Sequence, residues 1–494
     1  MKFLQEKRGY LLIQALVFGT IGIILIGALV GWAGANQRAT SQNAVRERAF
    51  QIAEAGIEYY RWHLAHAPTD YQDGTLLPGP YVHPYYDRIG NRIGQYSLTI
   101  TPPPSGSTVV TITSKGEVDG SPELDRIIEA RLAIPSLAKY AVVANDEMRF
   151  GEGTEVFGPV HSNSGIRFDG LAHNLVSSAL TTYDDPDHSE SGPDLLEFAV
   201  HTHVNPLPGT GTNDNARPNE APPASLANRP DVFVSGRAIS VPAVDFTGFT
   251  ADLAQIKTDA QSGGRYISAS GAQGYNIVLK TNDTFDLYRV TSLTAPPSSG
   301  CTNYLDQDGW GTWSIQNRTL VANYPIPANG LIFVEDHVWV DGQINTARVT
   351  IAAGRFPESP STHRSITVNK DLLYTNYDGQ DVIALIAQNN INIGMTSETD
   401  LRIDAALVAK NGRVGRYYYR PPSGGTRCSP YHTRTIITLY GMIGTNVRYG
   451  FAYTDGNGYQ TRNINYDANL LYGPPPSFPL TGDQYEVISW REVK

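Results

Sequence analysis

The chain has 494 residues, with 38 basic and 48 acidic side chains, so its formal net charge is −10. This length has room for two to four domains or for one elongated repeat domain, and the acidic balance argues against a protein that binds nucleic acid through a basic surface. The sparse charge (17%), the 28 tyrosines and the 47 glycines are typical of many short strands joined by turns, and they argue against a helical cytosolic enzyme.

An apolar segment near the N-terminus is the first predicted element. Tyr10–Val30 is almost wholly apolar, which is about the 20 residues needed to cross the hydrocarbon core of a membrane. A short peptide with a basic bias, residues 1–9, precedes it and is expected to stay cytoplasmic, which places the bulk of the chain outside. A cleaved secretory signal is the alternative, but the apolar run is long for one and only Ala33–Ala35 offers a small-residue cleavage site.

The helical pattern continues beyond this apolar segment without a breaker. Apolar residues recur at spacings of three and four up to about His66, with Glu54 and Glu58 among the polar positions, and Pro68 is the first proline. We therefore predict one helix over residues 10–66, about 85 Å long at 1.5 Å per residue. A simple anchor needs no such continuation, so the second half is expected to pack against protein along one stripe.

Two motifs in this helix carry a family resemblance. Lys7-Arg8-Gly9 followed by Tyr10-Leu11-Leu12-Ile13-Gln14 resembles the class III signal of type IV pilins and type II secretion pseudopilins, and residues 46–58 resemble the helix of PilX-type minor pilins. The resemblance implies cleavage between Gly9 and Tyr10 by a prepilin peptidase and methylation of the new amino group. It also implies that the helix lies in the inner membrane first and later contacts other pilin subunits.

One position departs from the family pattern. Major pilins have Glu at the fifth mature position, where it pairs with the amino terminus of a neighbouring subunit, whereas this chain has Gln14. A buried carboxylate needs a charged partner and a neutral amide does not. Gln14 therefore favours a minor subunit, with a place at the filament tip as one interpretation and neutral drift as the other.

A small antiparallel meander is predicted over residues 67–137. Three alternating runs, Gln95–Ile100, Val109–Ser114 and Arg126–Leu132, are separated by turn-forming segments rich in Pro, Gly, Asp and Ser. These strands are expected to cover the apolar stripe of the long helix, as in a pilin head.

A large solenoid is predicted over residues 138–494. Leu385–Asn390 matches Leu407–Gly412 at an offset of 22, and Gly441–Asn446 is a weaker copy 34 residues further on. A period near 22 with Asn at the corner is typical of a right-handed parallel β-helix, with Asn389 and Asn411 able to form a side-chain ladder. The predicted fold class is thus α+β, mainly β; a β-sandwich is the alternative, but it leaves the register unexplained.

Three polar excursions interrupt the predicted solenoid, at about 184–230, 294–313 and 417–433. Cys301 lies in the second and Cys428 in the third, and outside the cytoplasm such a pair is expected to form a disulfide. The proline-rich segment 473–479 and the strand-like residues after it are expected to cap the last coil.

Candidate metal ligands occur but lack a complete motif. Asp306 and Asp308 resemble the start of a calcium loop, but its distal Glu is replaced by Asn317, so calcium is a weak expectation and no metal or other cofactor is predicted. His201 and His203 place two imidazoles on one strand face, and with His161 and His173 they could form a zinc site; the sequence shows no firm third ligand.

Enzyme motifs are weaker still. Glu398, Arg402 and Asp404 are close in sequence, as in β-helix polysaccharide lyases, yet nothing separates them from a solvated strand. The predicted function is therefore a non-enzymatic minor pilin of a bacterial type IV pilus, single-pass before assembly and at the cell surface afterwards. Its β-helical head would prime assembly or adhere to a surface glycan or protein. A membrane-anchored glycan-active β-helix enzyme and a minor pseudopilin of type II secretion are the alternatives.

Overall fold

The computed structural model describes residues 6–104, 107–187, 196–212, 220–246, 248–482 and 484–493. Part of the predicted leader and parts of the first predicted excursion lie outside these residues. The chain divides into two compact units: one comprises Met1–Pro104, Val109–Ile134 and Asp483–Lys494, and the other comprises Ser105–Thr108 and Pro135–Gly482. One long helix followed mostly by strands, many of them parallel, confirms the predicted mainly-β α+β class.

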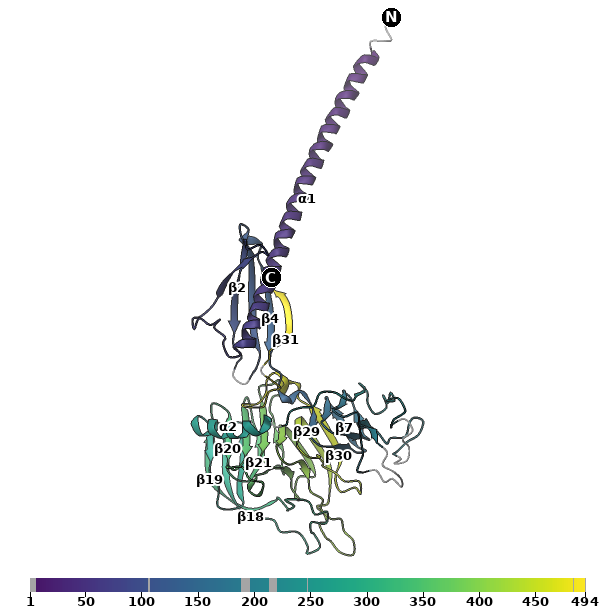
Figure 1. Ribbon diagram of the computed structural model, residues 1–494, viewed down its shortest axis with the longest axis vertical. Helices are drawn as coiled ribbons and strands as arrows, with labels where there is room; N and C mark the ends of the chain where they lie inside the picture. The colour runs from purple at the N-terminus through teal and green to yellow at the C-terminus, as the bar shows by residue number, and fades with distance from the viewer. Residues whose placement is uncertain are drawn as a thin grey trace. The chain divides into compact units, whose positions relative to one another are not determined.

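The first unit is one long helix with an antiparallel sheet against its second half (Figure 1). Helix α1 (Glu6–His66) has 61 residues, and it ends where the sequence predicted. The sheet has the strand order β1 (Tyr81–Tyr86), β2 (Arg92–Thr101), β3 (Val110–Val118), β4 (Arg126–Ala133), β31 (Glu486–Val493).

The second half of α1 is fixed on the sheet by an apolar stripe and by close backbone approach. Ile52, Ile57 and Leu64 are fully or almost fully buried against apolar residues of β2, β3 and β4. A Cβ on Gly116 in β3 would lie 2.1 Å from the carbonyl oxygen of Ala49, and one on Gly56 would lie 2.3 Å from Ser114 Oγ. Because these positions have no side chain, the helix and the sheet can touch.

Two strands of this sheet were not predicted. β1 contains Pro84, which is tolerated because β1 is an edge strand. β31 pairs antiparallel with β4, so the C-terminal residues belong to this sheet. Their expected place as a cap at the end of a 138–494 solenoid is therefore wrong, since sequence alone does not show which edge a distant strand joins.

The second unit is a solenoid of parallel strands (Figure 1). Its longest ladder runs, in spatial order, through β16 (Arg265–Ile267), β20 (Leu331–Val334), β22 (Arg348–Ala353), β25 (Val382–Ala387), β27 (Asp400–Ala409), β29 (Thr433–Thr445), β5 (Val142–Ala144), β8 (Val160–Ser162), β11 (Val176–Ser178) and β15 (Arg237–Ala238).

Two further faces complete the coils. The second contains β17 (Gly274–Lys280), β21 (Val338–Gln343), β23 (Ile366–Thr367), β26 (Ile391–Ile393) and β28 (Val414–Arg416), together with the separate ladder β6 (Met148–Phe150), β9 (Ile166–Phe168) and β14 (Val200–His201). The third runs through β24 (Leu372–Leu373), β27, β29, β30 (Gly458–Tyr466), β7 (Thr154–Phe157) and β10 (Leu171–Ala172).

The remaining elements lie outside the parallel ladders. A hairpin of β18 (Thr284–Leu293) and β19 (Ile315–Pro325) extends antiparallel from β17, and β12 (Thr182–Tyr183) pairs antiparallel with β13 (Glu197–Phe198). Helix α2 (Gly248–Ser262) lies against β16, β20 and β22. Short 3-10 helices cover Pro122–Leu124 in the first unit and Leu137–Lys139, Pro360–Thr362 and Ala468–Leu471 in the second.

The solenoid is built from two chain segments that meet in the middle of the stack. β29, near the C-terminal end of this unit, pairs with β27 on one side and with β5, its first strand, on the other. The segment after β15 then leads through α2 to β16, at the opposite end of the ladder. One continuous ladder therefore results although its coils are not in sequence order.

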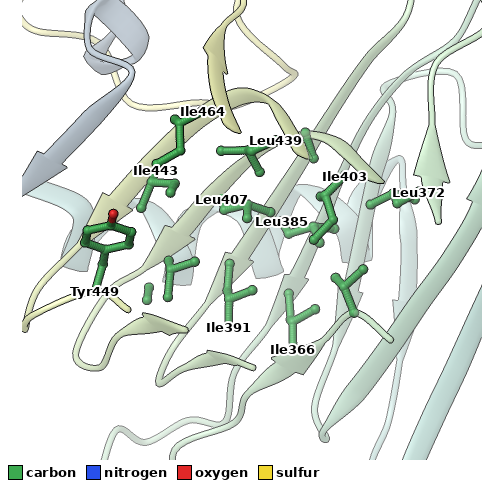
Figure 2. Packing of buried hydrophobic residues seen from close by; sticks show 14 of the residues in the cluster. Ile366, Leu372, Leu385, Ile391, Ile403, Leu407, Leu439, Ile443, Tyr449 and Ile464 are labelled. Atoms are coloured by element: carbon green, nitrogen blue, oxygen red, sulfur yellow. The ribbon is translucent and has the colours of Figure 1, made fainter. Parts of the chain in front are cut away.

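Stacked aliphatic residues form the solenoid core. Leu385 pairs with Leu407 and Leu407 with Ile443, so like residues lie in rows along successive coils (Figure 2). All six residues of β25 are buried because their alternate side chains join an inner cluster and an outer cluster, the latter with α2 residues. This explains why β25 is a continuous apolar run.

The predicted 22-residue offset is confirmed for one pair of coils only. Leu385 and Leu407 are in register, but the next copy is offset by 36 residues rather than 34, because Leu407 lies opposite Ile443. The asparagine ladder also lies elsewhere: Asn163 donates to Asn145 Oδ1 at 2.9 Å and Asn145 donates to Asn446 Oδ1 at 3.1 Å.

The proline-rich segment does not cap the last coil. Arg348 and Thr350 of β22 donate hydrogen bonds to the carbonyl groups of Gly473, Pro474 and Pro476. The segment thus crosses the outer face of an interior coil. Its prolines have no backbone N–H, so they need no hydrogen-bond acceptor there.

Candidate functional sites

The first half of α1 is an apolar surface that none of the described residues covers. Its large apolar residues between Tyr10 and Trp32 are 46–74% exposed. A Cβ built on Gly19, Gly22, Gly27 or Gly31 would meet nothing within 4 Å. The helix is long and apolar enough to cross a membrane, with a mean hydropathy of 2.4 over its best window.

The predicted processing and filament residues all lie on this helix. Tyr10 is 66% exposed, whereas Gln14 is partly buried within the helix surface. Glu54 and Glu58 are exposed on the second half, and Glu58 pairs with Arg61 at 3.4 Å. Cleavage between Gly9 and Tyr10 and contact of the helix with other subunits stay predictions.

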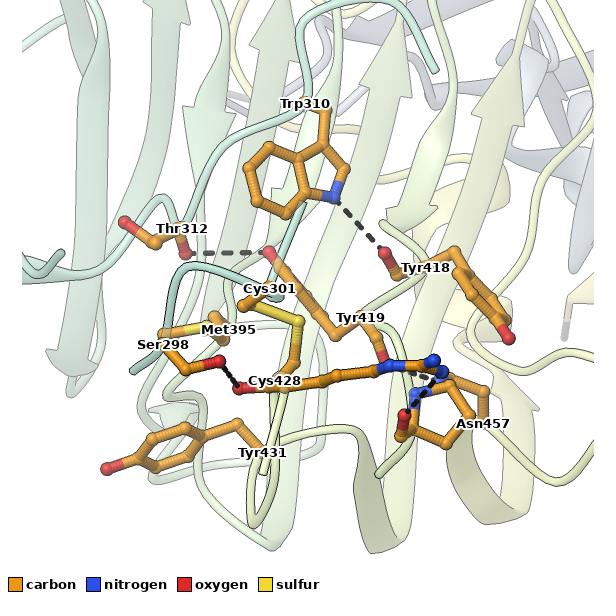
Figure 3. Close-up of a disulfide and its surroundings, with 12 residues drawn as sticks. Ser298, Cys301, Trp310, Thr312, Met395, Tyr418, Tyr419, Cys428, Tyr431 and Asn457 are labelled. Carbon is orange, nitrogen blue, oxygen red and sulfur yellow. Dashed lines mark hydrogen bonds between the residues drawn. A yellow bond between two sulfur atoms is a disulfide. The ribbon is translucent and has the colours of Figure 1, made fainter. Parts of the chain in front are cut away.

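A disulfide joins two loops of the solenoid. Cys301 and Cys428 are bonded to each other, with their Cα atoms 4.7 Å apart and a separation of 127 in the sequence. Figure 3 shows the bridge among Met395, Tyr419 and Tyr431, and both cysteines are buried in this small cluster. The link ties the loop between β18 and β19 to the loop between β28 and β29.

Hydrogen bonds fix the two loops on each other. Trp310 Nε1 donates to the carbonyl oxygen of Tyr418 at 3.1 Å (Figure 3), and Gln307 Oε1 accepts from the Tyr418 N–H at 2.8 Å. Burial raises the pKa of Tyr417 to about 12, so its phenol stays protonated and donates to the carbonyl oxygen of Asp308 at 3.1 Å. We call residues 294–313, 417–433 and 446–458 the loop face.

An aromatic side chain and its apolar neighbour are exposed at part of this loop face. Tyr304 is 57% exposed, with the Arg420 guanidinium 4.4 Å from its ring centroid, and Leu305 beside it is 48% exposed. Tyr418 and Tyr453, which are buried and partly buried, support them in edge-to-face contact at 5.1 Å and are not themselves part of the exposed surface. An exposed amphipathic ring such as that of Tyr304 can contact a sugar or a protein.

A polar cavity of about 680 Å³ adjoins the loop face. It is lined by residues that include Arg149, Arg413, Arg448, Gln307 and Tyr453. Two of the arginines are paired: Arg448 contacts Asp187, and Arg149 lies 3.4 Å from the same carboxylate. The cavity therefore combines both charges with phenol and amide groups.

The weak calcium candidates do not assemble a site among the described residues. Asp306 and Asp308 are both exposed in the loop between β18 and β19. The only group of three metal-binding side chains found in the described part of the chain does not contain them. The structure uses the backbone of Asp308 as an acceptor for Tyr417.

The histidines divide into two groups. His201 and His203 come together with Asp185, and all three are buried with their ligand atoms within 4.8 Å of one another. His161 instead contacts Ser177, and His173 pairs with Glu155 at 2.7 Å. The sequence showed the His-x-His pair but not its third member, which comes from a loop 16 residues earlier.

The lyase-like residues have structural partners. Asp404 is fully buried and accepts from the Tyr374 N–H at 3.1 Å and from the Tyr377 hydroxyl at 2.6 Å. Arg402 donates to the same carboxylate at 2.9 Å. These contacts hold adjacent coils together.

Comparison with known proteins finds no sequence relative and a weakly similar solved structure. No protein-family model and no curated protein matches the chain. A crystal structure of the competence-associated pilin ComZ from Thermus thermophilus is similar over 91% of this chain and 97% of that chain, at 13% identity and a TM-score of 0.29. A TM-score this low supports no conclusion about fold or role.

Proposed function

We propose that this protein is a non-enzymatic minor subunit of a bacterial type IV filament. The observation that carries the proposal is a helix of 61 residues whose second half is buried on its own sheet while its first half has a large apolar surface exposed. A helix hydrophobic all round must be covered by lipid or by other protein. Membrane storage followed by packing among like helices meets both requirements.

The resemblance of residues 7–14 to the class III signal supports the same proposal. It implies that a prepilin peptidase cuts after Gly9 and that the subunit leaves the membrane with Tyr10 at its N-terminus. Gln14 supports a minor subunit at the tip, since a neutral amide needs no charged partner from a subunit above it.

The solenoid would be the displayed part of this subunit. Its loop face offers exposed Tyr304 and Leu305 and the adjoining polar cavity, on a scaffold fixed by the disulfide. Binding residues are commonly placed on loops held by such a rigid scaffold. We propose that the loop face contacts a surface glycan or protein.

Site-specific cross-linking tests the filament proposal. A photo-reactive residue placed at Leu25, which is 57% exposed in the apolar half, should give adducts with other helix-bearing subunits in the sheared surface fraction. The same residue at Leu77, which is 65% exposed outside the helix, is the matched control and should give none of these adducts. Adducts to lipid or the membrane protein fraction alone would reject the filament role and favour an anchored enzyme.

Copy number tests the minor and tip assignments. Quantitative mass spectrometry of sheared filaments should find this chain far below the most abundant subunit, and Gln14→Glu should not raise its share. A share comparable to the main subunit, or a marked rise on Gln14→Glu, would place the protein in the shaft. Recovery only in a cell-envelope secretion complex would favour the pseudopilin alternative.

A further inference from the structure

Asp185, His201 and His203 form a buried cluster that contributes no residue to the loop face or to the lining of the polar cavity. His201 belongs to β14 and His203 follows it by two residues, whereas Asp185 comes from the loop after β12. The side chains of His201 and Asp185 are 0% and 3% exposed, and the ligand atoms of all three residues lie within 4.8 Å of one another.

The backbone holds these side chains in place. β14 is paired with β9, and Val200 lies in the solenoid core, so the next residue, His201, points to the other side of the strand. The N–H of His203 donates to Asp169 Oδ1 at 2.9 Å. Asp185 Oδ1 accepts from the N–H of Asp187 at 3.0 Å, and its other oxygen faces the histidines.

His201 is short of hydrogen bonds for a buried imidazole. Neither of its ring nitrogens has a hydrogen-bond partner among the described residues, although the ring is completely buried. Buried polar groups in native proteins are normally satisfied, so an orphan of this kind calls for an explanation. Its Nε2 lies 3.4 Å from Asp185 Oδ2, which is in the range of an ion pair but beyond a good hydrogen bond.

The separation of His201 and Asp185 matches that of two ligands on one cation. Zinc binds imidazole nitrogen and carboxylate oxygen at about 2.0–2.2 Å, so two ligand atoms of a tetrahedral site lie roughly 3.3–3.5 Å apart. The 3.4 Å between His201 Nε2 and Asp185 Oδ2 agrees with this separation. Two imidazoles and one carboxylate form a donor set that zinc accepts in known proteins.

Arg167, the guanidinium beside the cluster, is balanced by a second carboxylate, Asp169, so the carboxylate of Asp185 is left for the cation. Arg167 Nη1 lies 3.6 Å from Asp185 Oδ2, but the same guanidinium donates to Asp169 through Nε at 2.7 Å. Asp169 thus offsets Arg167, and Glu197, which is fully buried, adds a further carboxyl group at the Asp185 N–H.

We propose that Asp185, His201 and His203 bind one zinc ion, or a similar borderline divalent transition metal, as a structural site of the solenoid. The ion joins the loop after β12 to β14, in the excursion that is longest in sequence. Three protein ligands leave a fourth position for water or a further side chain. This site is independent of the filament role, so either proposal can fail alone.

Metal titration of the full chain tests the site. Detergent-solubilised protein is freed of metal with a chelator, and Zn²⁺ binding is measured by equilibrium dialysis with elemental analysis. We expect one tightly bound equivalent, and Co²⁺ in its place should give the visible absorption of a four-coordinate nitrogen–oxygen site. His201→Gln and Asp185→Asn should each weaken Zn²⁺ binding at least tenfold.

His173→Gln is the matched control, because His173 is 30% exposed and pairs with Glu155 away from the cluster. It should keep the tight equivalent. Because a cluster variant could fail to fold, the unmodified chain gives a second readout: Zn²⁺ should raise its unfolding temperature and Mg²⁺ should not. No tight equivalent in the unmodified chain, or equal binding by His201→Gln and His173→Gln, overturns the proposal in favour of a plain His201–Asp185 ion pair.

Discussion

The solenoid and helix α1 differ in how far they bury their apolar side chains. In the solenoid each row of aliphatic residues, such as Leu385, Leu407 and Ile443, is covered by the neighbouring coil. In α1 only the second half is covered, and Ile23 and Leu12 in the first half are 74% and 71% exposed. The solenoid therefore buries its own core, whereas the described residues leave the first half of the helix uncovered.

This difference indicates which part of the chain has apolar surface left for a partner. Burial of apolar area contributes about 25 cal/mol per Å², so a covered core is stable by itself while an exposed apolar helix seeks a partner. Variants in the two regions should consequently change different properties. Substitutions in the solenoid and the sheet should change folding stability, and substitutions in the first half of α1 should change association with a partner.

The largest expected effect is loss of the disulfide. Replacing both Cys301 and Cys428 by Ser should lower the free energy of unfolding by up to about 4–5 kcal/mol, because the bridge closes a loop of 127 positions. Hydrogen exchange should show the loss mainly in the loop face, with β25 and β27 still protected. Equal loss of protection in those two strands would contradict a solenoid that is stable through its own core.

Gly116→Ala is expected to be next in size. The added Cβ would lie 2.1 Å from the carbonyl oxygen of Ala49, so α1 must move off the sheet at a cost of about 3 kcal/mol. Hydrogen exchange over β3 and β4 in the detergent-solubilised chain measures the effect. Gly31→Ala, where the new atom meets nothing within 4 Å, is the control and should leave the sheet unchanged. Equal effects of the two substitutions would break the proposed division of α1.

Acid should weaken the solenoid through His337. Burial, aided by the charge of Arg364, lowers the pKa of His337 to about 4, and its Nδ1 accepts from the Ser365 N–H at 3.1 Å. The unfolded chain, with an ordinary pKa near 6.5, takes up the proton first, so stability is lost as the pH falls from about 6.5 to about 4. We expect this group to contribute about 3 kcal/mol across that window, since one pKa unit corresponds to about 1.4 kcal/mol.

His337→Asn isolates this contribution, because the amide oxygen can accept the same hydrogen bond but does not titrate. Its unfolding free energy should vary less with pH between 4 and 6.5 than that of the unmodified chain. An identical pH dependence for both chains would contradict this, because it would mean that His337 takes up a proton as readily in the folded solenoid as in the unfolded chain.

The smallest expected effect is at the junction of β29 and β5, where the two chain segments of the solenoid meet. Asn145→Ala removes both bonds of the ladder to Asn163 and Asn446 and should cost about 1 kcal/mol, since Asn145 is itself exposed. Asn282→Ala, at the turn of the β17–β18 hairpin, is the comparison and should cost less. If Asn282→Ala costs as much or more, the ladder does not stabilise the junction.

Sequence reasoning worked where the signal is local. The long helix follows from apolar spacing and from the absence of a proline before Pro68, and β2, β3 and β4 follow from alternation between turn residues. The 22-residue offset follows from the close match of Leu385–Asn390 to Leu407–Gly412, whose strand residues Leu385–Ala387 and Leu407–Ala409 are in true register.

Sequence reasoning failed where the partner is distant in the chain. Nothing in Glu486–Val493 shows that it joins β4, and nothing in β29 shows that it pairs with β5. The cluster at His201 illustrates the same limit at a site. The His-x-His spacing is visible, but Asp185 becomes its neighbour only through the path of an irregular loop.

The most direct test of the filament role is the intact mass and N-terminal residue of the protein released from cells by shearing. We predict a chain that begins at Tyr10, with the added mass of one methyl group on its amino terminus, recovered in the sheared fraction. A chain that still begins at Met1 and is found only in membranes would contradict the account, because α1 would then be a permanent anchor.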